Sequence, residues 1–121
     1  MVLDPIWDFE PGDWVLFSGQ LGAGKTTLIR ALLRKFGARG PIRSPSYGHL
    51  YEYATDPPVV HADLYRSEQP NLSLFQPYLD THIFLVEWGE RLPADWSAQA
   101  RARVSIAVEG SSRLISVQTT S

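Results

Sequence analysis

The sequence contains no cysteine, and this absence excludes both disulfide bonds and metal sites built on thiolates. It has no apolar run approaching the ~18 residues that a membrane-spanning helix needs. The opening segment, MVLDPIWDFEPGD, lacks the basic start and the apolar core of a signal peptide. These three absences favour a cytoplasmic protein that has no membrane role of its own.

An excess of positive charge is also missing, because the formal net charge is -2. The chain as a whole therefore has no general electrostatic attraction to nucleic acid. The strongest local exception is a basic segment that contains Arg30, Arg34, Lys35, Arg39 and Arg43. This segment could contact RNA, but cations on the polar face and in the last turn of a helix also stabilise the helix dipole. We favour the second interpretation.

The residues that are present suit one globular domain over residues 1–121, with 44% apolar and 20% charged residues. Residues 14–18, WVLFS, predict a buried strand. Apolar residues at helical spacing begin after Lys25 and predict a helix that ends before Gly37. This apolar stripe consists of Leu28, Ile29, Leu32, Leu33 and Phe36.

Further strands are predicted at residues 47–53, 59–63 and 82–88, with one or two short helical turns within residues 67–80. Residues 101–118 alternate on both sides of Gly110 and predict a β-hairpin. We therefore expect an α/β fold of the P-loop NTPase type. Its sheet should have a mostly parallel centre flanked by helices and a C-terminal antiparallel hairpin.

The segment between the first strand and the first helix, GQLGAGKT at residues 19–26, satisfies the pattern G-x-x-x-x-G-K-[ST]. In such a loop, backbone N–H groups and the helix N-terminus face the oxygens of a nucleotide triphosphate. Lys25 is then placed to bridge the β- and γ-phosphates, and the Thr26 hydroxyl to hold Mg²⁺. The alternative, a chance glycine-rich turn, is disfavoured because both the pattern and its strand-to-helix setting agree.

Two carboxylates end predicted strands and could complete a magnesium site. Glu87 follows Ile83–Val86, and Asp63 follows a similar run that is interrupted by His61. Sheets of this kind place ligands at the carboxyl ends of their strands. One acid could therefore hold the metal while the other orients or deprotonates the attacking water, unless both are solvated strand ends.

Each of three other residues could belong either to the site or to the surrounding structure. His61 lies within a strand, where a histidine is more often satisfied in the core than a ligand, so we leave it out of the site. Trp88 could pack over the site or belong to the core, and we favour the core. Ser46, in the segment SPSY, could present a hydroxyl to Mg²⁺ or the γ-phosphate, or could occupy an ordinary turn.

Missing motifs narrow the class of phosphate-binding protein. We do not expect guanine recognition by N-K-x-D, because the one asparagine, Asn71, stands in PNLS, and no D-x-x-G segment is present. A transporter-type L-S-G-G-Q element is absent too. A compact regulatory ATPase or a small-molecule kinase remains.

Several ordered segments resemble the bacterial TsaE (YjeE) family. They are GQLGAGKTT, RSPSYGHLYEY, VVHADLYR and FLVEWGERLP, followed by a hairpin with an arginine just after its turn. The resemblance implies an ATPase that uses ATP and Mg²⁺ in making threonylcarbamoyladenosine beside the anticodon of ANN-decoding tRNAs. It further implies TsaD-like and TsaB-like partner proteins, with tRNA engaged through their complex and the group transfer carried out by TsaD.

The resemblance also implies roles for individual residues. Catalytic roles fall on Lys25, Asp63 and Glu87, and magnesium ligation on Thr26 and Glu87. The implied nucleotide contacts are Gly19, Gln20, Leu21, Gly22, Ala23, Gly24, Lys25, Thr26, Thr27, Ser46 and Arg113.

The chain departs from the family pattern at three places. Gln20 replaces an aspartate, and Ser46 replaces a threonine but keeps its hydroxyl. Family members also carry a strand and a helix before the turn at Pro11, and we expect both to be absent here, either because the start is truncated or because this version lacks them. Besides the accessory ATPase, two interpretations stay open: a small-molecule kinase, and an interaction module in which ATP occupancy rather than turnover is the signal.

Overall fold

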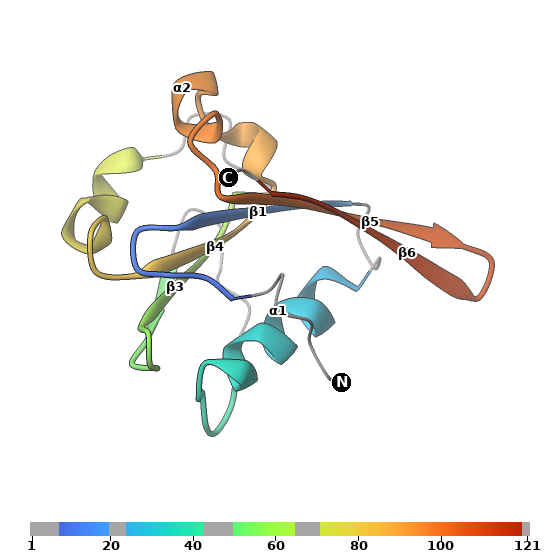
Figure 1. Cartoon of the computed structure of the whole chain (residues 1–121), viewed down its shortest axis with the longest axis horizontal. Coiled ribbons are helices and arrows are strands. Elements are labelled where there is room, and N and C mark those ends of the chain that lie inside the picture. Colours follow the sequence, from blue (N-terminus) through green and yellow to red (C-terminus); the bar gives the residue numbers. More distant parts are fainter. Residues whose placement is uncertain (1–7, 20–23, 43–49, 65–70, 120–121) are drawn as a thin grey trace.

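A six-stranded β-sheet forms the middle layer of the computed structural model, which describes residues 8–19, 24–42, 50–64 and 71–119 (Figure 1). The order across the sheet is β2-β3-β4-β1-β5-β6. The strands are β1 Trp14–Gly19, β2 Leu50–Tyr53, β3 Val59–Asp63, β4 Ile83–Glu87, β5 Ala102–Glu109 and β6 Ser112–Thr119. The helical elements are α1 Lys25–Lys35, η2 Leu72–Tyr78, η3 Gly89–Arg91 and α2 Ala94–Ser97.

The four central strands, β3, β4, β1 and β5, run parallel, and β2 and β6 pair antiparallel at the two edges. All five residues of β4 and the first four of β3 are buried, as expected for parallel strands that are covered on both faces. The carboxyl ends of β1, β3 and β4 consequently meet at one edge of the sheet. The predicted α/β fold with a mostly parallel centre and a C-terminal hairpin is confirmed.

Helix α1 covers one face of the sheet (Figure 1). Its apolar stripe packs on side chains of β1 and β4 such as Phe17 and Leu85, both fully buried. The opposite face carries η2, α2 and an aromatic group centred on Trp14, whose ring stacks on Phe84 at 4.1 Å between centroids. The sheet therefore separates two apolar clusters, and only one of them lies under α1.

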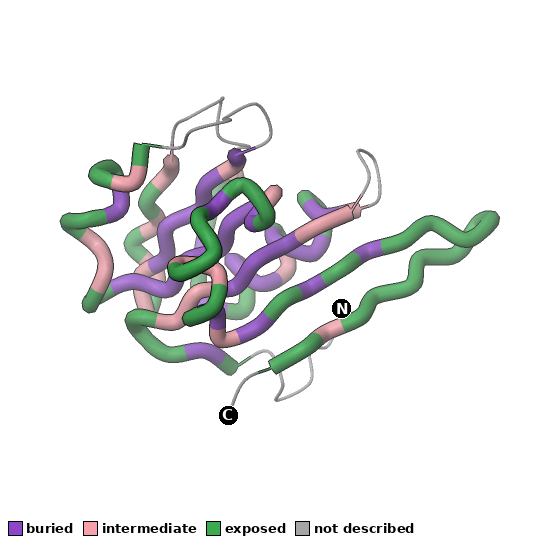
Figure 2. Tube along the Cα trace, turned by 90° about the horizontal axis from the view of Figure 1, so that it is seen from above, coloured by how far each residue is buried: buried purple, intermediate pink, exposed green. Residues whose placement is uncertain are grey.

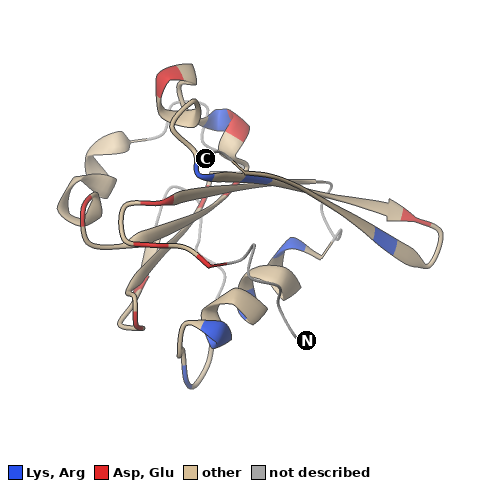
Figure 3. Ribbon diagram, viewed as in Figure 1, with Lys and Arg blue, Asp and Glu red and all other residues tan. Residues whose placement is uncertain are grey.

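The C-terminal end of α1 shows what two residues of the basic segment do. Arg34 donates to the carbonyl oxygens of Ala38 and Gly40 at 2.9 and 2.7 Å, and Lys35 pairs with Asp8 at 2.6 Å. Figure 3 shows basic residues on α1 and in the turn that follows it. Arg34 and Lys35 thus stabilise the end of the helix, in agreement with the favoured interpretation. Arg43 lies outside the described residues.

The hairpin of β5 and β6 extends away from the two apolar clusters (Figure 2). All eight pairs from Ala102 opposite Thr119 to Glu109 opposite Ser112 are formed. Strand β6 is exposed along its length apart from the half-buried Val117, and Leu114 is 50% exposed. The inner half of β5 therefore belongs to the core, while the outer half of the hairpin contributes little to it.

Two further expectations concern the segment before Pro11 and the lack of a membrane-spanning helix. Residues 8–13 form neither strand nor helix. Residues 1–7 lie outside the described part of the chain, so the expected absence of a leading strand and helix stays a prediction. None of the helices formed by described residues has the length and apolar character to span a bilayer.

A pair of leucines tests the assignment of the core. Leu33→Ala removes a fully buried side chain from the inner face of α1 and should lower the free energy of unfolding by about 2–5 kcal/mol. Leu114→Ala removes the same atoms from the exposed outer part of the hairpin and should change it by roughly 0.5 kcal/mol or less. Urea denaturation measures both values. Equal losses in the two variants would contradict this division of the hairpin from the core.

Candidate nucleotide-binding site

The described residues place a strand end before the glycine-rich segment and a helix N-terminus after it. β1 ends at Gly19, and a Cβ there would lie 2.5 Å from the Ile106 carbonyl oxygen of β5, so only glycine fits. Gly24 has φ 101°, in the left-handed region, and its carbonyl accepts the first helical bond from the Leu28 N–H at 3.1 Å. The N-terminus of α1, where unpaired N–H groups attract anions, thus directly follows the loop. Gln20, Leu21, Gly22 and Ala23 lie outside the described residues.

Lys25 is a buried cation at the start of α1, with 5% of the residue exposed. Its Nζ donates to the Gly19 carbonyl oxygen at 2.5 Å and lies over the Trp88 ring, 4.1 Å from the centroid. Among the described residues no carboxylate forms an ion pair with it. Because buried charges are normally paired, this ammonium group is suited to an anion at the loop.

Trp88 packs against the core, as the sequence interpretation favours, and its ring also contacts Lys25. It has φ 61°, an unusual value for a residue other than glycine, and its N–H donates to the Phe17 carbonyl oxygen at 2.8 Å. This conformation turns the chain directly after Glu87, so that the indole contacts Lys25. The available signal was the position of Trp88 immediately after the candidate carboxylate.

The two candidate carboxylates lie side by side at the carboxyl ends of neighbouring strands. Asp63 is the register partner of Glu87 in the parallel pair of β3 and β4. Neighbouring strands are about 4.8 Å apart, and side chains at paired positions point to the same face. Glu87 is 5% exposed and Asp63 is half-buried. The structure therefore brings these two acids together, as predicted from their strand-end positions.

The sequence interpretation keeps His61 out of the site, but in the structure this side chain contacts Glu87. Its Nε2 lies 2.8 Å from Oε2 of Glu87, and both side chains are buried. The histidine is indeed a core residue, but its partner is the candidate carboxylate itself. Strand alternation gave the available signal, because His61 faces the same side of the sheet as Asp63 two residues later.

The remaining predicted residues differ in where they lie. Thr26 and Thr27 are exposed in the first turn of α1. Arg113 is exposed on β6, where it pairs with Val108 of β5. Val108 is two residues beyond Ile106, which is the register partner of Gly19. The Nη1 of Arg113 donates to the Ser112 carbonyl oxygen at 3.4 Å. Ser46 lies outside the described residues. Its proposed contact, like that of Arg113, stays a prediction.

The donor set suits a magnesium ion shared with phosphate. Two carboxylates end neighbouring strands and the Thr26 hydroxyl belongs to the first turn of α1, whereas the described residues contain no metal-binding cluster of three or more histidine, cysteine or acidic side chains. Mg²⁺ usually takes one or two carboxylates and completes its shell with phosphate oxygens and water. The residues present therefore fit a nucleotide-bound magnesium better than an all-protein cage.

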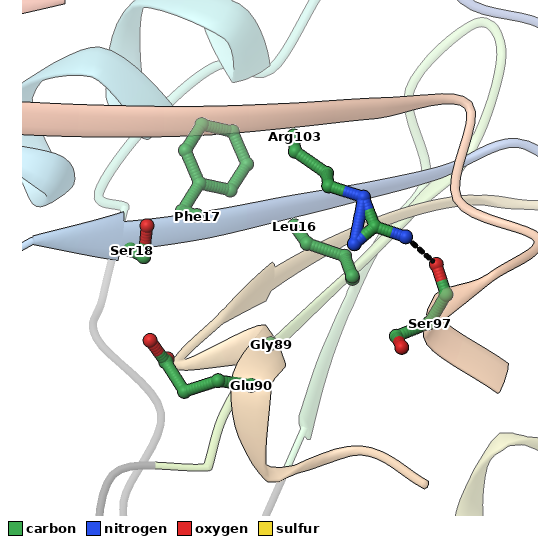
Figure 4. Close-up of a pocket in the computed structure, with 7 residues that line it drawn as sticks. All are labelled: Leu16, Phe17, Ser18, Gly89, Glu90, Ser97 and Arg103. Atoms are coloured by element: carbon green, nitrogen blue, oxygen red, sulfur yellow. Dashed lines mark hydrogen bonds between the residues drawn. The ribbon is translucent and has the colours of Figure 1, made fainter. Parts of the chain in front are cut away.

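A separate hollow of about 280 Å³ lies beside Leu16, on the face opposite α1 (Figure 4). Ser18, Glu90 and Arg103 line it, and Arg103 donates to the Ser97 carbonyl oxygen. Gly89 forms part of its wall, where a Cβ would lie 2.6 Å from the Cβ of Leu16. None of the predicted catalytic or metal-binding residues lines this hollow, so it is distinct from the Lys25 and Glu87 site.

Comparison with known proteins shows which family the chain belongs to. The family model described as "Threonylcarbamoyl adenosine biosynthesis protein TsaE" matches residues 5–115. The chain belongs to the TsaE family. The resemblance seen in the sequence motifs is thereby confirmed.

Individual TsaE proteins support the assignment. The Streptomyces coelicolor protein is 42% identical over 65% of this chain and 58% of its own length, and the Haemophilus influenzae protein is 40% identical over 68% and 55%. The Nostoc protein is 34% identical over 83% and 67%. All three are named tRNA threonylcarbamoyladenosine biosynthesis protein TsaE. The chain thus spans little more than half the length of the first two relatives.

A solved structure shares the fold. The crystal structure of YdiB from Bacillus subtilis superposes with a TM-score of 0.66 at 25% identity, and the match covers 93% of this chain and 70% of that one. The arrangement of the sheet and its C-terminal hairpin is therefore common to another protein of known structure.

Replacing the buried cation tests the phosphate-loop assignment. Lys25→Ala should weaken ATP binding by about tenfold or more, because a hydrogen bond to a charged group is worth roughly 1.5–3 kcal/mol. Isothermal titration calorimetry measures the affinity. Lys35→Ala is the matched control, since Lys35 pairs with Asp8 at the other end of α1. Unchanged ATP affinity in a folded Lys25→Ala protein would refute the assignment.

Proposed function

We propose that this TsaE-family chain is an accessory ATPase for the formation of threonylcarbamoyladenosine in tRNA, beside the anticodon of ANN-decoding tRNAs. It binds and hydrolyses ATP with Mg²⁺ in the cytoplasm. It acts with TsaD-like and TsaB-like proteins and does not itself transfer the group. The observation that carries the nucleotide-binding part is the buried Lys25 ammonium group, which has no ion-pair partner among the described residues.

Each residue of the site has a role in this proposal. Lys25 moves from the Gly19 carbonyl to the β- and γ-phosphates, while the indole of Trp88 keeps one side of the ammonium covered. Thr26 and Glu87 hold the metal. Bound Mg²⁺ supplies charge neutralisation to the phosphates. Asp63, which is half-buried and therefore more accessible than Glu87, orients the attacking water.

The role in tRNA modification rests on the family, whose curated members are named for this biosynthesis. Charge supports an indirect contact with tRNA. The formal net charge is -2, and two cations of the basic segment, Arg34 and Lys35, are engaged at the end of α1. Since phosphate contacts supply most of the non-specific affinity for nucleic acid, we place the tRNA contacts on the partner proteins.

Hydrolysis assays with and without the partners test the proposal. The chain alone should hydrolyse ATP feebly, and a TsaB-TsaD pair should raise the rate by about tenfold or more, a change of at least about 1.4 kcal/mol in the activation barrier. Rapid hydrolysis that ignores the partners would contradict the accessory role. Transfer of the γ-phosphate to a metabolite would instead reveal a small-molecule kinase.

A comparison of two variants separates turnover from occupancy. At saturating ATP, Glu87→Gln should still bind the nucleotide but lose hydrolysis and repeated rounds of tRNA modification, whereas Lys25→Ala should bind ATP at least about tenfold more weakly and lose both activities. Reconstituted multiple-turnover modification is the measurement. Full modification by a Glu87→Gln protein that binds ATP without hydrolysing it would show that ATP occupancy alone is the signal.

A further inference from the structure

The contact between His61 and Glu87 joins two buried side chains from adjacent strands. Relative exposure is 2% for the His61 side chain and 6% for that of Glu87, and the Nε2 to Oε2 distance is 2.8 Å. The other ring nitrogen, Nδ1, is buried and has no hydrogen-bond partner among the described residues. One end of the imidazole is therefore committed to the carboxylate, and the other contacts no polar group of the described chain.

This geometry selects one hydrogen-bonding arrangement. If the proton were on Nδ1, a donor would be buried without an acceptor, and the Nε2 lone pair would face a carboxylate oxygen. With the proton on Nε2, the ring donates to Oε2, and only an acceptor at Nδ1 is left unpaired. The geometry therefore favours the tautomer in which Nε2 is the donor and Oε2 the acceptor.

A purely structural role accounts poorly for this pair. Replacing a buried ion pair by apolar residues of similar volume is often neutral or stabilising, because desolvation offsets the attraction between the groups. The surroundings are already apolar, since Val59 and Leu85 on the same face are fully buried. The pair as a whole thus gives the core no advantage over two apolar residues, and what His61 supplies is a donor for the buried Glu87 carboxylate.

We propose that His61 is a positioning residue for Glu87. Its Nε2–H holds Oε2, which fixes the carboxylate and leaves Oε1 as the oxygen for the magnesium ion of the bound nucleotide. Outer hydrogen-bond partners of this kind orient metal ligands, and their loss costs about 10- to 100-fold in metal affinity or activity. This inference rests on the metal-binding part of the proposed function, and it adds His61 to the residues that determine how that metal is held.

Two substitutions of His61 separate positioning from packing. Glutamine can place its amide N–H near the position of Nε2, whereas asparagine is too short to reach Glu87 and places its amide near Nδ1. Both are polar and uncharged, so their effects on the core should be similar. His82→Asn is a matched control, because it breaks another histidine–glutamate contact, 2.7 Å to Glu52, at the opposite end of β4.

The measurement is ADP affinity by calorimetry, once with Mg²⁺ and once with a chelator. The increase in affinity caused by Mg²⁺ should fall about 10- to 100-fold in His61→Asn and less than about threefold in His61→Gln and His82→Asn. Affinity in chelator should be the same in all four proteins. Thermal melts confirm that each variant is folded. A full response to Mg²⁺ in folded His61→Asn, or equal losses in the asparagine and glutamine variants, would overturn the inference.

Nitrogen-15 spectra of the unliganded wild-type chain give a second test that does not depend on activity or on the folding of a variant. His61 should carry its proton on Nε2, and that proton should exchange slowly with water because it is buried and hydrogen-bonded. A proton on Nδ1 alone would overturn the inference even if ATP hydrolysis is found. Conversely, failure of TsaB-TsaD to stimulate hydrolysis, with the Mg²⁺ response of the His61 variants as expected, would reject the accessory role and support the positioning role.

Discussion

The buried ammonium group of Lys25 is the constraint on which the rest of the site depends. A cation at 5% exposure is costly unless its surroundings compensate it, and here the described surroundings supply a carbonyl oxygen from Gly19 and the face of Trp88. Both groups are neutral. The carbonyl comes from the end of β1 and the indole from the left-handed turn after β4, so the pairing of β1 with β4 positions both groups that contact Lys25.

The parallel pairing of β3 with β4 determines how the acidic residues and His61 lie relative to one another. In the β3 and β4 register, Asp63 lies opposite Glu87 and His61 lies opposite Leu85, so the imidazole reaches the carboxylate diagonally along the sheet. A shift of one residue would send His61 and Asp63 to the opposite face, among the aromatic side chains. The buried apolar runs of both strands specify this register, because they fill the two clusters on either side of the sheet.

The sequence predicted those features that depend on local pattern. Strand β1 and helix α1, which flank the glycine-rich segment, and the C-terminal hairpin all follow from local apolar patterns. The role of His61 could not be found in this way, because its partner is 26 residues further along the chain and the contact depends on the register of two strands. The contact between the Trp88 indole and Lys25 depends on one backbone angle, φ 61° at Trp88, which no local sequence pattern predicts for a residue other than glycine.

The pairing of Gly19 with Ile106 connects the phosphate loop to the hairpin. At this pair the β5 backbone approaches so closely that a side chain on residue 19 would meet the Ile106 carbonyl oxygen. The start of the loop is consequently fixed by the same strand that continues outward as the exposed half of the hairpin. Arg113 lies only two residues beyond this close approach, on the side of the sheet that α1 covers. Arg113 is the one basic residue of β6, and the hairpin thus places it on the same side of the sheet as Asp63 and Glu87.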